Sequence, residues 1–212
     1  MTKQLPRLSA EELNMRFELQ REPIRSRLEE FSRVPASEYF YELMYCLLTP
    51  QSSAVNAAKA VRLFRVHDLQ HSPIDPEPLL HQPDFYIRFH KTKAQHILAA
   101  KDKFPVIAEQ LVNGTSGISL REWLVENVTG LGWKEASHFL RNIGHRNLAI
   151  LDRHILKNLL RAGVIKRLPA TLTAKRYLSI EKKFIKFSHL SGISMDELDL
   201  LFWSMETGEI LK

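Results

Sequence analysis

A lysine and an aspartate are the residues of this sequence best suited to covalent chemistry. Lys134 falls in the first turn of an expected helix, where the helix dipole opposes a positive charge and favours a neutral amine. A neutral amine is the nucleophile that Schiff-base chemistry requires. Asp152 opens the segment DRHILKNLL, where an aspartate is usually just a helix cap. Taken separately, each residue therefore also has an ordinary structural interpretation.

Two glycines just before this lysine indicate a helix-hairpin-helix within residues 119–145. Gly130 and Gly132 enclose Leu131, which would plug the turn into the core, and a second helix would begin near Trp133. The glycines allow positive φ and close backbone approach, and free N–H groups in the first turn of the second helix can bind a phosphate oxygen. The alternative is an ordinary helix–helix connection with a glycine cap.

The elements around these residues are predicted to be helical. A serine followed three residues later by glutamate is a capping-box pattern that predicts a helix start. It occurs at Ser9/Glu12, Ser119/Glu122 and Ser194/Glu197. Apolar periodicity predicts further helices at 36–48, ending before Pro50, at 52–64, at 91–104, ending before Pro105, and in PVIAEQLV, LREWLVENV, WKEASHFLRNI, DRHILKNLLRA, 173–187 and MDELDLLFWSM.

The fold class predicted from these patterns is all-α. Strong alternation of apolar and polar residues between hairpin turns is missing, and the chain has only 8 glycines, so a sheet protein is not expected. The stretch 67–85 holds four prolines and predicts a long connection, with room for one short helix at 76–82.

Composition and charge favour a globular protein with a polyanionic partner. The 212 residues are 44% hydrophobic and 25% charged, which excludes disordered and collagen-like classes and allows one domain or two small lobes. Lys+Arg exceed Asp+Glu by 30 − 24, a net charge of +6. From Lys134 to Lys186 there are 13 Lys+Arg against 3 acidic residues, so this span carries +10. Such a span is typical of a phosphate-facing surface, although a solvated helical face would look similar.

Membrane, disulfide and metal chemistry are not expected. No apolar run approaches the roughly 20 residues needed to span a bilayer, and the opening MTKQLPRLSAEEL turns acidic before a signal-peptide core forms. A cytosolic protein is therefore expected. Cys46 is the single cysteine and is expected to pack in the core. His67 and His71 are four residues apart but lack a third ligand in register, so no metal site is expected.

The segment TGLGWKEASHFLRNIGHRNLAILDRHIL resembles the helix-hairpin-helix DNA glycosylases, and specifically the type-2 8-oxoguanine DNA glycosylase/AP lyases of archaea and some thermophilic bacteria. The segments LLTPQSSAVNAAKAV (47–61) and RFHKTKAQHI (88–97) are similar to the wider endonuclease III superfamily, and the ending WSMETGEILK adds to the match. The four-cysteine iron–sulfur loop of many endonuclease III relatives is missing. The chain also lacks room for the extra N-terminal β-domain of larger eukaryotic-type enzymes, so the small type-2 form fits best.

The resemblance implies a role for each matching residue. Lys134 would attack C1′ of the damaged nucleotide, expel the base and form a Schiff base, after which β-elimination nicks the strand on the 3′ side. Asp152 would help activate the lysine and stabilise positive charge developing on the sugar. Gly130 and Gly132 would contact the DNA backbone.

Three further residues are implied in handling the flipped base. Gln51 matches the position that fills the vacated stack, although it could simply be a polar residue after Pro50 at a helix start. Trp203 and Lys212 match positions credited with stacking and polar contact to the base. Without the resemblance, Trp203 would be read as a core residue of LDLLFW and Lys212 as a frayed end.

The expected architecture is two helical lobes with DNA in a cleft between them. One lobe would span 36–146 and end in the hairpin at about 119–144, and the other would join 1–35 to 147–212, so that the lysine and the aspartate face each other. The partner would be double-stranded DNA containing 8-oxoguanine or abasic sites, bound by a monomer in the cytoplasm, at the nucleoid, with no cofactor, metal or membrane. Two alternatives are a related lyase acting on oxidised pyrimidines and a non-catalytic helix-hairpin-helix module that binds duplex DNA.

Overall fold

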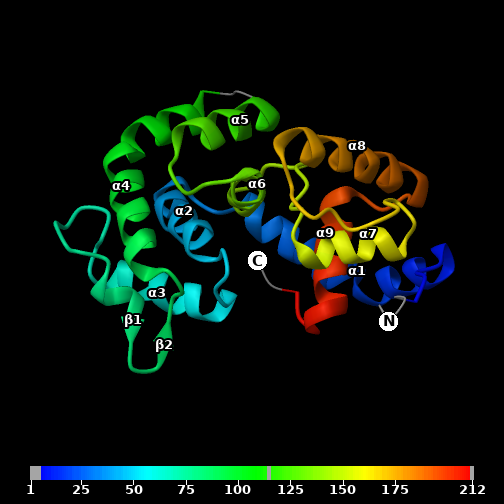
Figure 1. Cartoon of the computed structure of the whole chain (residues 1–212), viewed down its shortest axis with the longest axis horizontal. Coiled ribbons are helices and arrows are strands. Elements are labelled where there is room, and N and C mark those ends of the chain that lie inside the picture. Colours follow the sequence, from blue (N-terminus) through cyan, green and yellow to red (C-terminus); the bar gives the residue numbers. More distant parts are fainter. Residues whose placement is uncertain (1–5, 114–115, 211–212) are drawn as a thin grey trace. The chain divides into compact units, whose positions relative to one another are not determined.

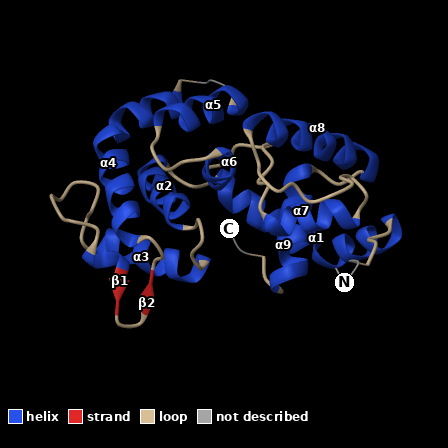
Figure 2. Ribbon diagram, viewed as in Figure 1, coloured by secondary structure: helices blue, strands red, loops and turns tan. Residues whose placement is uncertain are grey.

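A computed structural model describes residues 6–113 and 116–210, and most of them are helical (Figures 1 and 2). The chain divides into two compact units, one made of 1–33 with 144–212 and the other of 34–143. Within the described residues, β-structure is confined to one hairpin of two-residue strands. The all-α prediction is confirmed. No helix in the described part of the chain has the length and apolar character required to cross a membrane.

The unit at 34–143 is built around one fully buried helix. Its elements are η1 (Ala36–Glu38), α2 (Tyr39–Leu48), α3 (Ala54–Val66), η2 (Pro78–Leu80), β1 (His81–Gln82), β2 (Phe85–Tyr86), α4 (His90–Val112), α5 (Gly117–Asn127) and α6 (Trp133–Asn142). Helix α2 packs against α3, α4 and α6, and it is buried from Phe40 to Leu48. A helix that is apolar on nearly all sides belongs in a core. Cys46 is fully buried there, as expected.

The other unit gathers helices from both ends of the chain around α9. Its helices are α1 (Ala10–Ser32), α7 (Arg153–Arg161), α8 (Ala174–Ser191) and α9 (Met195–Thr207). Helix α9 packs against α1, α7 and α8, and its Leu201 and Phe202 are fully buried. The predicted cap at Ser9 is confirmed, and both arms of the capping box between Ser194 and Glu197 are formed.

Two predicted helix boundaries are wrong. Helix α4 does not end before Pro105 but continues to Val112, because proline has a helical φ and the buried face formed by Ala100, Phe104 and Ile107 continues across it. Helix α5 begins at Gly117, capped by Ser116, and so Ser119 lies inside the helix. The Ser116 hydroxyl accepts a hydrogen bond from the Ser119 backbone N–H at 3.3 Å, the bond that the Ser119 pattern would have made three residues later.

The proline-rich connection is more structured than expected. A short helical turn is present, as predicted for 76–82, but it covers only Pro78–Leu80. The chain then forms the hairpin in which His81 pairs with Tyr86 and Gln82 with Phe85.

Candidate active site

The predicted hairpin joins α5 to α6, and Leu131 is buried in its turn. The Leu131 N–H donates to the Val128 carbonyl at 3.1 Å, which closes the turn. Gly130 has φ +86° and Gly132 is extended with φ −86° at the start of α6. Both glycines are exposed, so their backbone groups are accessible to a ligand.

Only one of the two glycines is required by its conformation and surroundings. A Cβ at Gly130 would lie 2.3 Å from Nδ1 of His96 on α4, and positive φ already disfavours other residues there. A Cβ at Gly132 would lie 2.9 Å from a carboxylate oxygen of Glu135, which is the far end of a flexible side chain. The expectation of positive φ therefore holds for Gly130 and not for Gly132.

Lys134 lies in the first turn of α6, two residues after Gly132. Its Nζ is 3.0 Å from a carboxylate oxygen of Glu135, and its side chain is 27% exposed. The Lys134 side chain is thus partly exposed, and its amine has an adjacent carboxylate. Glu135 was not singled out from the sequence, where it is simply an acidic residue of a helical first turn.

A second amine lies close to Lys134. Lys93, in the first turn of α4, is buried, and its Nζ donates hydrogen bonds to the turn that follows α2. Burial, and then the nearby charge of Lys134, lower the pKa of Lys93 to about 8, against the opposing effect of Glu135. The segment around Lys93 was noted in the sequence, but nothing in its pattern shows that this particular lysine turns inward.

Gln51 occupies the turn that Lys93 contacts. It is exposed and has φ +54°, in the left-handed region that residues other than glycine adopt at a cost of about 1–2 kcal/mol. The Gln51 side chain therefore projects from the turn between α2 and α3 and not from a helix. The structure thus places Gln51, the hairpin glycines and Lys134 in the same unit.

Asp152 lies in the other unit and caps α7. Its Oδ1 accepts hydrogen bonds from the backbone N–H groups of His154 and Ile155, both at 2.8 Å. The capping interpretation is confirmed. Because both bonds fall on one oxygen and the residue is only half-buried, the cap does not occupy the whole carboxylate.

Trp203 of α9 lies near the same end of α7. The His154 ring meets the indole edge to face, with centroids 5.0 Å apart at 85°. The indole is partly exposed, although its Nε1 is buried and has no hydrogen-bond partner among the described residues. His154 therefore connects the Asp152 cap to Trp203. Lys212 lies outside the described residues.

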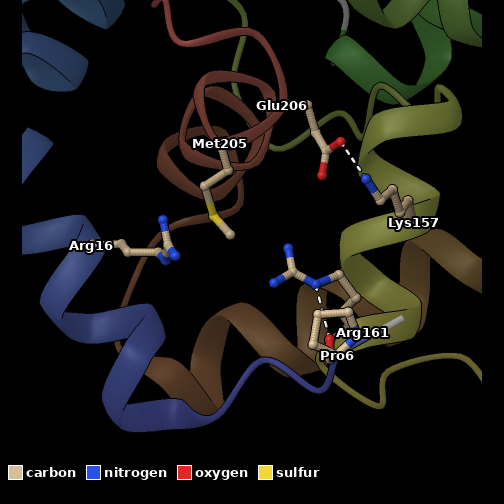
Figure 3. A pocket seen from close by; sticks show the side chains of 6 residues that line it. All are labelled: Pro6, Arg16, Lys157, Arg161, Met205 and Glu206. Atoms are coloured by element: carbon tan, nitrogen blue, oxygen red, sulfur yellow. Dashed lines mark hydrogen bonds and ion pairs between the residues drawn. The ribbon is translucent and has the colours of Figure 1, made fainter. Parts of the chain in front are cut away.

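A pocket of about 310 Å³ lies in the same unit, beside Glu206 (Figure 3). Its lining comes from the chain before α1 and from α1, α7 and α9: Pro6, Arg16, Lys157, Arg161, Met205 and Glu206. Lys157 Nζ is 2.5 Å from Glu206. Burial opposes ionisation of Glu206, but the hydrogen bond and charge of Lys157 outweigh it, so the pKa of Glu206 is lowered. The pocket is thus polar, with a carboxylate already neutralised by lysine.

The residues that the structure describes contain no metal-binding cluster. No group of three or more His, Cys, Asp or Glu side chains among them could hold a metal ion. The hairpin unit offers a partly exposed lysine side chain that closely follows two exposed glycines.

The fold and this site define a helix-hairpin-helix protein of the DNA-binding class. The family model for 8-oxoguanine DNA glycosylase matches residues 24–193. An 8-oxoguanine DNA glycosylase/AP lyase of Fusobacterium nucleatum is 39% identical over 198 residues, covering 89% of this chain and 90% of the relative. One of Korarchaeum cryptofilum is 38% identical, covering 91% of each.

Solved structures agree with the sequence matches. The Methanocaldococcus jannaschii 8-oxoguanine glycosylase/lyase, crystallised with a 15mer DNA containing 8-oxoguanine, superposes with a TM-score of 0.83 at 30% identity, covering 94% of this chain and 99% of that one. The 8-oxoguanine DNA glycosylase of Thermotoga maritima has a TM-score of 0.82 at 31% identity, covering 96% and 98%. The chain belongs to the 8-oxoguanine DNA glycosylase family.

Proposed function

We infer that the protein is a bifunctional DNA repair enzyme that excises 8-oxoguanine from duplex DNA and then nicks the strand at the resulting abasic site. One observation carries this function. About nine-tenths of the chain matches relatives that are named 8-oxoguanine DNA glycosylase/AP lyase. The hairpin, followed closely by a partly exposed lysine, supports the proposal, because a lysine amine can carry out the chemistry of both activities. Its partner is double-stranded DNA.

We propose Lys134 as the nucleophile. Its nitrogen attacks C1′ as the bond from C1′ to the base breaks, and the base leaves with that electron pair and takes up a proton. The nitrogen then gives a proton to the ring oxygen O4′ as the C1′–O4′ bond breaks, so that the opened sugar carries a protonated Schiff base. Loss of a proton from C2′ then breaks the C3′–O bond and nicks the strand. The amine must first leave the carboxylate of Glu135, 3.0 Å away.

Asp152 is proposed to stabilise the positive charge that develops on the sugar. A carboxylate whose cap bonds fall on one oxygen keeps negative charge available on the other. The cap also fixes the orientation of the carboxylate, because its two N–H donors belong to the rigid first turn of α7.

The remaining residues are proposed to hold the DNA and the flipped nucleotide. Gly130 and Gly132 would place backbone N–H groups against a phosphate. Removing a nucleotide from the stack costs a few kcal/mol, and Gln51 would offset part of it by filling the gap. Trp203 and Lys212 would contact the extruded base. We propose that the enzyme acts in the cytoplasm, at the nucleoid.

Borohydride trapping tests the proposal. Reduction of the Schiff base should leave a covalent protein–DNA band with a duplex that carries one 8-oxoguanine, and none with an unmodified duplex. Lys134→Gln should lose the band, whereas Lys59→Gln, which removes a lysine ion-paired to Asp84 in the same unit, should keep it.

Other patterns would change the assignment. A band only on abasic or thymine glycol duplexes would keep the lyase and reassign the lesion to an oxidised pyrimidine. Duplex binding with no band on any substrate would indicate a non-catalytic binding module.

A further inference from the structure

The turn between α2 and α3 is tied to α4 by a single buried amine. Lys93 Nζ donates to the carbonyl oxygens of Leu48 and Pro50, each at 2.7 Å, and to the Ser52 hydroxyl at 3.1 Å. The lysine is only 6% exposed. Three neutral acceptors from one short stretch of chain therefore converge on one side chain.

The number of donors matches the number of acceptors. A protonated lysine has three N–H groups and no acceptor, so each hydrogen of Lys93 has one partner in this turn. The Leu48 carbonyl ends α2, where helix carbonyls lack partners within the helix and a positive charge is favourable. The turn is thus held by the charged form of the amine.

These contacts fall on both sides of Gln51. Pro50 precedes it and Ser52 follows it, and the Ser52 hydroxyl also accepts from the Arg88 N–H at 3.1 Å. A residue with φ +54° persists only where its surroundings determine the backbone on each side. Lys93 provides part of this constraint, because its amine binds the Pro50 carbonyl just before Gln51 and the Ser52 hydroxyl just after it.

We propose that Lys93 is a positioning residue of base excision, which holds the turn from Leu48 to Ser52 so that Gln51 is presented to the gap left by the flipped nucleotide. The inference rests on the proposed function, and specifically on the stack-filling role of Gln51. Lys93 would contact neither the base nor the sugar and would act only through this turn.

The protonation of Lys93 gives the inference a second readout. Burial and the charge of Lys134 lower its pKa to about 8, and the facing carboxylate of Glu135 opposes them. A neutral amine has two hydrogens for three acceptors, so the turn loses one anchor as the pH rises through this range. The benefit that Gln51 gives to excision should decline over the same range.

A double-mutant cycle tests the inference through the single-turnover release of 8-oxoguanine from a duplex near neutral pH. Lys93→Met and Gln51→Ala should each slow excision by roughly tenfold to a hundredfold, the scale of a misplaced group. The double variant should be no slower than Gln51→Ala alone, because the lysine acts through the glutamine. Lys93→Arg, which keeps a charged donor, should recover part of the loss, and Lys59→Met is the surface control.

A pH series makes the test independent of any Lys93 variant, should these fold poorly. The ratio of the native rate to the Gln51→Ala rate should approach one as the pH rises from about 7 to about 9.5, and the ratio cancels the pH effects that both enzymes share. A ratio constant with pH, additive losses in the cycle, or a native rate for Lys93→Met would overturn the inference while the native enzyme still excises 8-oxoguanine. If the native chain releases no 8-oxoguanine, the proposed function fails, and the inference fails with it.

Discussion

At the scale of single residues, Asp152 caps α7, and we also propose a chemical role for its carboxylate. Asn caps a helix about as well as Asp, whereas Ala in their place costs about 1 kcal/mol. We therefore expect Asp152→Asn to retain the free energy of unfolding and Asp152→Ala to lose about 1 kcal/mol, by denaturant titration. Both should slow 8-oxoguanine release about a hundredfold or more, because both remove the charge that we propose stabilises the sugar cation. An Asp152→Asn enzyme as fast as the native one would leave this residue a cap only.

Residue type and position predicted some contacts and missed others for a physical reason. The cap at Asp152 follows from an aspartate just before an apolar helical run, since both partners lie within three residues. The bonds of Lys93 join residues more than 40 positions apart, and the direction in which that lysine points is decided by the packing of α4 on α2. Local spacing holds no signal for such a contact.

At the scale of elements, the hairpin turn allows a test that separates close packing from backbone strain. Gly130→Ala puts a methyl group against His96 at positive φ, whereas Gly163→Ala, also at positive φ, meets nothing within 4 Å. We expect Gly163→Ala to lose only the strain energy of about 1–2 kcal/mol and to keep its affinity for duplex DNA. Gly130→Ala should lose more stability and also bind DNA more weakly, because the turn must shift. Thermal unfolding and fluorescence anisotropy measure both effects, and equal behaviour of the two variants would contradict the assignment of the hairpin.

Helix positions were largely predictable because capping and apolar periodicity are local. Trp133 and Tyr39 begin helices close to the predicted positions, and Ser194 forms its full capping box. Pro105 misled the prediction, since the cost of its missing N–H is outweighed by apolar burial on either side, which only the tertiary structure reveals. The hairpin at 81–86 was missed because strands of two residues have no periodicity.

At the scale of the whole molecule, the uneven charge predicts how affinity responds to salt. The span from Lys134 to Lys186 carries +10 in a chain of net +6. If it neutralises roughly six phosphates or more, affinity for duplex DNA should fall by about 10³ or more between roughly 50 and 200 mM salt. The logarithmic slopes for 8-oxoguanine and undamaged duplexes should be parallel, because phosphate contacts do not depend on the base. A flat response would place the basic span away from the DNA.

The interleaved path of the chain also affects how the protein is made. Helix α1 packs on α9, which follows it only after the whole of 34–143 has been synthesised. While a ribosome is still producing α7 and α8, helix α1 lacks α9, although Phe17, Ile24 and Leu28 of α1 are buried in the finished fold. The nascent chain therefore exposes the apolar face of α1 for most of its synthesis. Chaperones that shield such surfaces would therefore have more time to bind α1 than to bind α9.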